Sequence, residues 1–233
     1  MIYLTYIFGA LTMLFGILTA VLYHKESYRL AKDAKMTAAA FFLALGAASC
    51  ALSPVNGAAA AVIYAGFIPS FAGDYFLAKK EYPLSAEDDF GAFSLGVASF
   101  AIAQILYFVG FMYAAGWRLS PLFIPLAAYS LIPTVGGIAS KFLSVEKKRI
   151  PIMIGYGILL SLTLFASASR YHLYPSTGSL LALVGSICFC LSDTALGSYY
   201  FANINIDKKL LNYPIMALYF AAQILYAFSM LYS

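Results

Sequence analysis

Eight long apolar runs, separated by short polar connections, follow one another along the 233-residue chain. Each run contains about 20 residues, the length that an α-helix needs to cross the hydrocarbon core of a bilayer. The pattern predicts membrane-spanning helices near residues 2–23, 36–53, 57–78, 91–115, 120–141, 150–169, 178–201 and 211–232. We therefore expect an all-α, polytopic integral membrane protein with a single transmembrane domain.

The composition argues against a cytosolic enzyme, a secreted disulfide-linked domain and a nucleic-acid-binding protein. Hydrophobic residues make up 63% of the chain and charged residues 10%, whereas a soluble domain has about 25% charged residues. The net charge of +4 is spread over short loops, which argues against a nucleic-acid partner. Cys50, Cys188 and Cys190 all lie within apolar runs, where packing is their expected role.

The distribution of basic residues predicts the orientation in the membrane. Of the 14 Lys and Arg residues, 12 follow the first, third, fifth and seventh runs, and Arg118 and Arg170 lie on the other side. Basic loops remain in the cytoplasm. Both termini are therefore expected outside, and the location in a bacterium would be the inner membrane.

One short motif occurs twice. Ala103–Tyr107 has the sequence Ala-Gln-Ile-Leu-Tyr, which returns 119 positions later at Ala222–Tyr226. The same spacing separates Asp74 from Asp193. It also relates Gly66 to Gly185 and Leu77 to Leu196. We expect two parallel four-helix repeats, approximately 1–115 and 120–233, related by an axis along the membrane normal.

Asp74 and Asp193 are the candidate catalytic residues. The other eight acidic residues lie in or beside predicted cytoplasmic loops, whereas these two lie within apolar runs. An acid inside the membrane costs about 2.5–3.5 kcal/mol and usually marks a functional site. The alternative is a hydrogen bond between helices, which contributes about 0.6 kcal/mol.

Other polar side chains are expected near this pair. Gln104 and Gln223 lie on spans four and eight, which enter the membrane from the cytoplasmic side. Tyr107 and Tyr226 follow three residues later on the same helix faces. They would converge on a pocket that opens inward, although Gln223 and Tyr226 are equally compatible with structural hydrogen bonds. Lys35 is expected to extend its amine to the membrane interface or, alternatively, to contact a substrate phosphate.

A histidine-based site is not expected. His24 and His172 lie on opposite sides of the predicted membrane, which excludes a histidine triad or a zinc site built from both. The sequence indicates no requirement for a metal or an organic cofactor.

Short motifs in a specific order relate the chain to a known family. They are Gly73-Asp74 in span three; Phe93, Gly96, Phe100, Ala103, Leu106, Tyr107 and Phe111 in span four; Tyr156-Gly157 in span six; Gly185–Phe189, Leu191-Ser192-Asp193 and Phe201 in span seven; and Met216, Tyr219, Ala222 and Gln223 in span eight. With these motifs the chain resembles, from span two to span eight, the YhhN family of eight-span membrane proteins, which includes the lysoplasmalogenases.

The resemblance implies hydrolysis of the vinyl ether bond of a lysoplasmalogen, which yields a fatty aldehyde and a glycerophospho-ethanolamine or -choline. It implies Asp74 and Asp193 as the acidic pair. Further side chains that would line the site are Tyr107, Tyr156, Tyr219 and Gln223. Animal members of the family carry a histidine at the position of Gln104. A glutamine side chain, unlike histidine, transfers no proton. Either the two aspartates suffice for the reaction, or the activity of this chain differs.

Two carboxyl groups suit vinyl ether hydrolysis, because one donates a proton to carbon and the other stabilises the cation or activates water, as in glycoside hydrolysis. The main alternative is a proton-coupled transporter of lipids or small molecules, in which the two halves rock and the aspartates exchange protons. A lysolipid sensor is a third hypothesis. The preferred head group, the chain length and the oligomeric state remain open.

Overall fold

The computed structural model describes residues 2–53, 57–80, 89–129, 131–202 and 207–232 and confirms the all-helical fold. Its α-helices are α1 (Ile2–His24), α2 (Tyr28–Ala51), α3 (Gly57–Lys80), α4 (Asp89–Ala114), α5 (Leu131–Ala139), α6 (Ile150–Leu173), α7 (Thr177–Phe201) and α8 (Asn212–Leu231). Three 3₁₀ segments are η1 (Pro121–Ala128), η2 (Lys147–Arg149) and η3 (Lys208–Leu211). Within the described ranges, eight helical segments are long and apolar enough to cross a membrane, so the chain is a multi-pass membrane protein.

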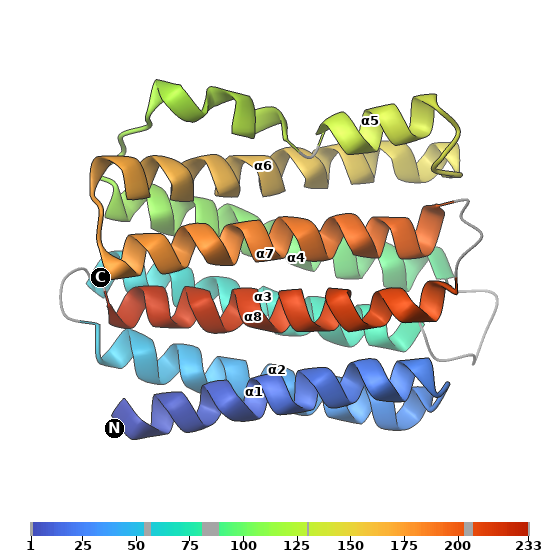
Figure 1. Ribbon diagram of the computed structural model, residues 1–233, viewed down its shortest axis with the longest axis horizontal. Helices are drawn as coiled ribbons and strands as arrows, with labels where there is room; N and C mark the ends of the chain where they lie inside the picture. Colours follow the sequence, from blue (N-terminus) through green and yellow to red (C-terminus); the bar gives the residue numbers. More distant parts are fainter. Residues whose placement is uncertain (1, 54–56, 81–88, 130, 203–206, 233) are drawn as a thin grey trace.

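The helices lie side by side with their long axes nearly parallel, and both termini are at the same end of the bundle (Figure 1). Consecutive helices pack in the pairs α1 with α2, α3 with α4, and α7 with α8. Helix α2 also packs against α8, and α6 packs against α4. If residues 1–115 are exchanged with residues 120–233, these last two contacts correspond to each other.

Two glycines give the halves a common internal feature. A Cβ atom on Gly66 would lie 2.5 Å from the ring of Tyr107, and one on Gly185 would lie 2.8 Å from the ring of Tyr226. The glycines are therefore needed for the close approach of these rings. The ring centroids of Tyr107 and Tyr226 are 4.7 Å apart, so the equivalent tyrosines of the two halves meet in the core.

The fifth span is broken, in contrast to the continuous helix expected over residues 120–141. It consists of η1 and α5, and none of the described residues in these two segments is buried. Pro125 lies inside η1, and proline lacks the amide hydrogen that a regular helix requires. Pro133 lies in the first turn of α5, where the missing hydrogen is tolerated. This span forms one edge of the bundle, against α6 (Figure 1).

Helix α2 begins at Tyr28, eight positions before the start of the predicted span at residue 36. The additional turns place Lys35 inside the helix, on a face with the buried Ala31 and Ala38. The interpretation of Lys35 as an interface lysine is wrong, because its side chain is buried among the helices. Small neighbours on the same face leave room for it.

Candidate active site

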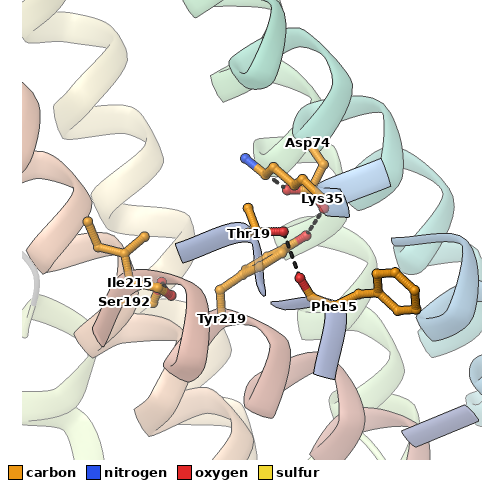
Figure 2. Close-up of polar contacts among 7 residues, drawn as sticks. All are labelled: Phe15, Thr19, Lys35, Asp74, Ser192, Ile215 and Tyr219. Atoms are coloured by element: carbon orange, nitrogen blue, oxygen red, sulfur yellow. Dashed lines mark hydrogen bonds and ion pairs between the residues drawn. The ribbon is translucent and has the colours of Figure 1, made fainter. Parts of the chain in front are cut away.

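Asp74 on α3 lies at the centre of a buried polar cluster (Figure 2). The Nζ atom of Lys35 on α2 is 3.4 Å from its Oδ1 atom. The hydroxyl group of Tyr219 on α8 donates a hydrogen bond to its Oδ2 atom over 2.6 Å. Three helices thus converge on one carboxylate, and the ion pair offsets part of the cost of its burial.

Asp193 on α7 lies in a similar environment but has no ion pair among the described residues. The hydroxyl group of Tyr156 on α6 donates a hydrogen bond to its Oδ2 atom. Each aspartate is therefore bound by a tyrosine of another helix. The position 119 residues after Lys35 is Ile154, so the ion pair of the first half has no equivalent at that position. Asp193 nevertheless lies within electrostatic range of both Asp74 and Lys35.

A cavity of about 140 Å³ lies beside Asp193, between α3, α4, α5, α6 and α7. Its walls are mainly apolar and include Phe93, Phe100, Leu143, Met153, Leu196 and Phe201. Tyr156 also lines it, and Asp193 is the one carboxylic acid among the described residues of its wall. The cavity therefore presents an acid–tyrosine pair to an apolar ligand.

Basic side chains lie near one end of this cavity. The guanidinium carbon of Arg149 is 5.1 Å from the centroid of the Phe93 ring, which lines the cavity. Arg149 also forms an ion pair with Glu146. A hydrogen bond from Lys148 lowers the pKa of Glu146, which therefore remains ionised at neutral pH. Lys148 and Arg149 both form ion pairs with Glu146, so basic side chains gather beside the Phe93 wall of the cavity.

A third cluster of polar side chains lies deeper in the bundle. Tyr107 donates a hydrogen bond to Oε1 of Gln223 over 2.9 Å, and its hydroxyl oxygen is 3.0 Å from that of Ser70. Tyr226 and Ser186 form a similar hydroxyl pair, also at 3.0 Å. These side chains are buried, and together with neighbouring phenylalanines they form a packed layer across the bundle.

Gln104 lies near the second aspartate. Its side chain is fully buried, and its amide is oriented toward the hydroxyl group of Tyr156. Neither amide atom forms a complete hydrogen bond within the described part of the chain. A buried amide of this kind is available to a water molecule or a ligand group near Asp193.

The candidate residues from the sequence thus fall into two groups. Asp193 and Tyr156 line the cavity. The other candidates lie behind its described wall or deeper in the bundle: Asp74, Lys35, Tyr219, Gln104, Tyr107 and Gln223. Sequence reasoning missed the Lys35–Asp74 ion pair. Its signal was the spacing of Lys35 from Ala31 and Ala38, which places it on the buried face of a helix.

Comparison with known proteins agrees with this architecture. The model of the YhhN family matches residues 30–230, which include every candidate residue named above. No curated protein and no solved structure shows significant similarity to the chain. Because the family match covers most of the sequence, the chain belongs to the YhhN family.

Proposed function

We propose that the protein hydrolyses the vinyl ether bond of lysoplasmalogens, with Asp193 as the acid that contacts the substrate. The observation that carries the proposal is the position of Asp193 and Tyr156 on the wall of an apolar cavity, within electrostatic range of a second aspartate. Family membership is consistent with it.

The cavity suits an amphiphilic substrate. Its phenylalanine, leucine and methionine side chains favour an acyl-chain segment, whose transfer from water contributes about 0.8 kcal/mol for each buried methylene group. The guanidinium of Arg149 beside the Phe93 ring provides donors that suit the phosphate of the head group. A lysophospholipid placed in this way would bring the linkage between chain and head group near Asp193.

The reaction begins with transfer of the proton of Asp193 to the vinyl carbon remote from the ether oxygen. The carbon next to that oxygen becomes an oxocarbenium ion, and Asp193 becomes a carboxylate. Water then attacks this carbon and returns a proton to Asp193. The resulting hemiacetal breaks its bond to the glycerol oxygen, releasing a fatty aldehyde and the glycerol hydroxyl group. The hydrogen bond from Tyr156 to Oδ2 leaves Oδ1 to carry the proton.

Asp74 has a different role in this mechanism. Lys35 and Tyr219 hold its carboxylate in a region of low dielectric constant, where a fixed negative charge acts more strongly than in water. That charge stabilises the oxocarbenium ion as it develops near Asp193. Lys35 is thus a positioning residue for Asp74 in this proposal.

The packed layer around Tyr107 and Tyr226 favours hydrolysis over transport. Both rings are completely buried and lie 4.7 Å apart. Neither ring is part of the described wall of the cavity at Asp193, so this layer is packed core outside that cavity. A transporter would require this layer to separate.

Aldehyde release by detergent-purified protein tests the proposal. A vinyl ether lysophospholipid is compared with the matched saturated ether lipid, for the native chain, Asp193→Asn and Asp33→Asn. Asp33 is exposed and provides the matched control. We expect aldehyde from the vinyl ether alone, a loss of about 100-fold or more in Asp193→Asn, and full activity in Asp33→Asn. No aldehyde, or full activity in Asp193→Asn, would contradict the proposal.

A further inference from the structure

Gln104 on α4 carries a buried amide whose hydrogen-bonding capacity is not used by the described residues. Its side chain is fully buried, and neither Oε1 nor Nε2 has a hydrogen-bond partner in the part of the chain that the structure describes. The equivalent glutamine of the second half differs, because Oε1 of Gln223 accepts a hydrogen bond from Tyr107. A buried amide without partners costs stability, and such an exception to good packing points to a functional role.

The position of this amide relates it to the acid of the proposed mechanism. Phe100 lines the cavity at Asp193, and Gln104 follows it by one turn on the same face of α4. The backbone carbonyl of Gln104 accepts a hydrogen bond from Oγ1 of Thr163 over 3.1 Å, which joins this turn to α6. The amide is oriented toward the hydroxyl group of Tyr156, which in turn donates a hydrogen bond to Asp193. Tyr156 thus connects the amide with the acid.

We propose that Gln104 holds the water molecule that attacks the oxocarbenium ion. This role rests on the proposed hydrolysis, in which Asp193 becomes a carboxylate when its proton moves to carbon. One hydrogen atom of the water is donated to Oε1 of Gln104 and the other to that carboxylate, since both oxygens are acceptors. A lone pair of the water oxygen is then directed at the cation, as orientation of a reactant requires.

The step balances without proton transfer by the amide. The water oxygen forms a bond to the carbon next to the ether oxygen, and one water proton passes to the carboxylate of Asp193. Gln104 neither gains nor loses a proton, because an amide is a hydrogen-bonding group that does not titrate. A glutamine is therefore sufficient at this position, where the task is to orient water and not to deprotonate it.

Competition between water and methanol tests this role in the purified full-length protein. A vinyl ether lysophospholipid reacts in detergent at a fixed concentration of methanol. Capture of the cation by water leads to fatty aldehyde, whereas capture by methanol gives a mixed acetal that keeps the head group. The ratio of acetal to aldehyde, measured by mass spectrometry, is independent of how fast the cation forms. The acid-catalysed reaction without protein gives the ratio for unselective capture.

Gln104→Met removes the amide at nearly constant volume. It should raise the ratio of acetal to aldehyde about tenfold or more, toward that of the acid-catalysed reaction, because an apolar side chain does not favour water over methanol. The melting temperature should be unchanged or higher, since no complete hydrogen bond is lost. Gln104→Asn keeps an amide and should give an intermediate ratio. Ile105→Met places the same side chain at an exposed position of α4 and should keep the native ratio.

The failure of this role is distinguishable from the failure of the proposed function. Absence of aldehyde from the native chain would contradict the hydrolysis and, with it, the role of Gln104. Aldehyde release with the same ratio in the native chain and Gln104→Met would overturn this role alone, whatever the change in rate, because an amide that only orients Tyr156 or supports the fold does not select water. If Gln104→Met does not fold, a native ratio in Gln104→Asn has the same meaning.

Discussion

Lys35 on α2 and Asp74 on α3 form an ion pair that is almost completely removed from solvent, with side chains 4% and 1% exposed. The corresponding position near Asp193 in the second half is Ile154. Two aspartates at equivalent places in the sequence thus have different surroundings: one is paired with a cation, and the other faces an apolar cavity. This asymmetry allows them to perform different functions.

The ion pair predicts that substitutions of Lys35 and Asp74 have strongly non-additive effects on the free energy of unfolding. Lys35→Met should lower the free energy of unfolding by about 3–5 kcal/mol, because it leaves Asp74 buried without its cation. The double variant with Asp74→Asn should recover most of this loss. Lys209→Met removes an exposed ion pair with Glu26 and should cost less than about 1 kcal/mol. Unfolding by denaturant in detergent measures all three, and additive effects would show that the buried charges do not interact.

Tyr156 is expected to affect the reaction more than the fold. Tyr156→Phe removes the hydrogen bond to Asp193 and should lower kcat about 10-fold to 100-fold, with a small change in KM. Tyr113→Phe alters an exposed ring on α4 and serves as the control. Steady-state aldehyde release measures both constants. An unchanged kcat in Tyr156→Phe would remove this tyrosine from the mechanism.

The cavity itself is tested by filling it. Gly197 lines the cavity, and a Cβ atom at this position would meet no atom within 4 Å. Gly197→Phe should therefore fold but reduce kcat/KM about tenfold or more for long-chain substrates, because remote binding energy supports catalysis. Gly155→Phe places the same ring at an exposed position of α6 with equal space around it. Similar kinetics in the two variants would mean that the acyl chain of the substrate binds elsewhere.

The contacts of Gly66 and Gly185 predict matching losses of stability in the two halves. Gly66→Ala and Gly185→Ala each force a methyl group against a buried tyrosine ring and should cost about 1–3 kcal/mol. Gly155→Ala meets no neighbouring atom and should leave the melting temperature nearly unchanged. Thermal unfolding of the three variants provides the comparison. A large loss in one half alone would argue against equivalent packing.

The orientation in the membrane is open to a direct test. The excess of basic residues in alternate loops predicts that the C-terminus lies outside the cytoplasm. Alkaline phosphatase fused to the C-terminus in a bacterial host should then be active, and green fluorescent protein at the same place should be dark. The opposite pair of results would invert the predicted topology.

Much of the fold follows directly from the sequence. Apolar runs of membrane-spanning length predict helices because an unpaired backbone cannot cross lipid, and the structure confirms eight such segments in its described part. The family suggested by motifs around Asp74, Asp193 and Gln223 is also confirmed. These features are local, or depend on spacing along the chain, and are therefore visible without a tertiary structure.

The partners of each polar side chain depend on packing between distant helices. Tyr219 reaches Asp74 across 145 positions of sequence, and no local pattern assigns it to Asp74 in preference to Asp193. Lys35 is buried because α2 begins earlier than its apolar run. The sequence by itself determined the spans and the acids within them. The tertiary structure decided which acid is neutralised and which faces a cavity, because ion pairing and burial depend on neighbours supplied by other helices.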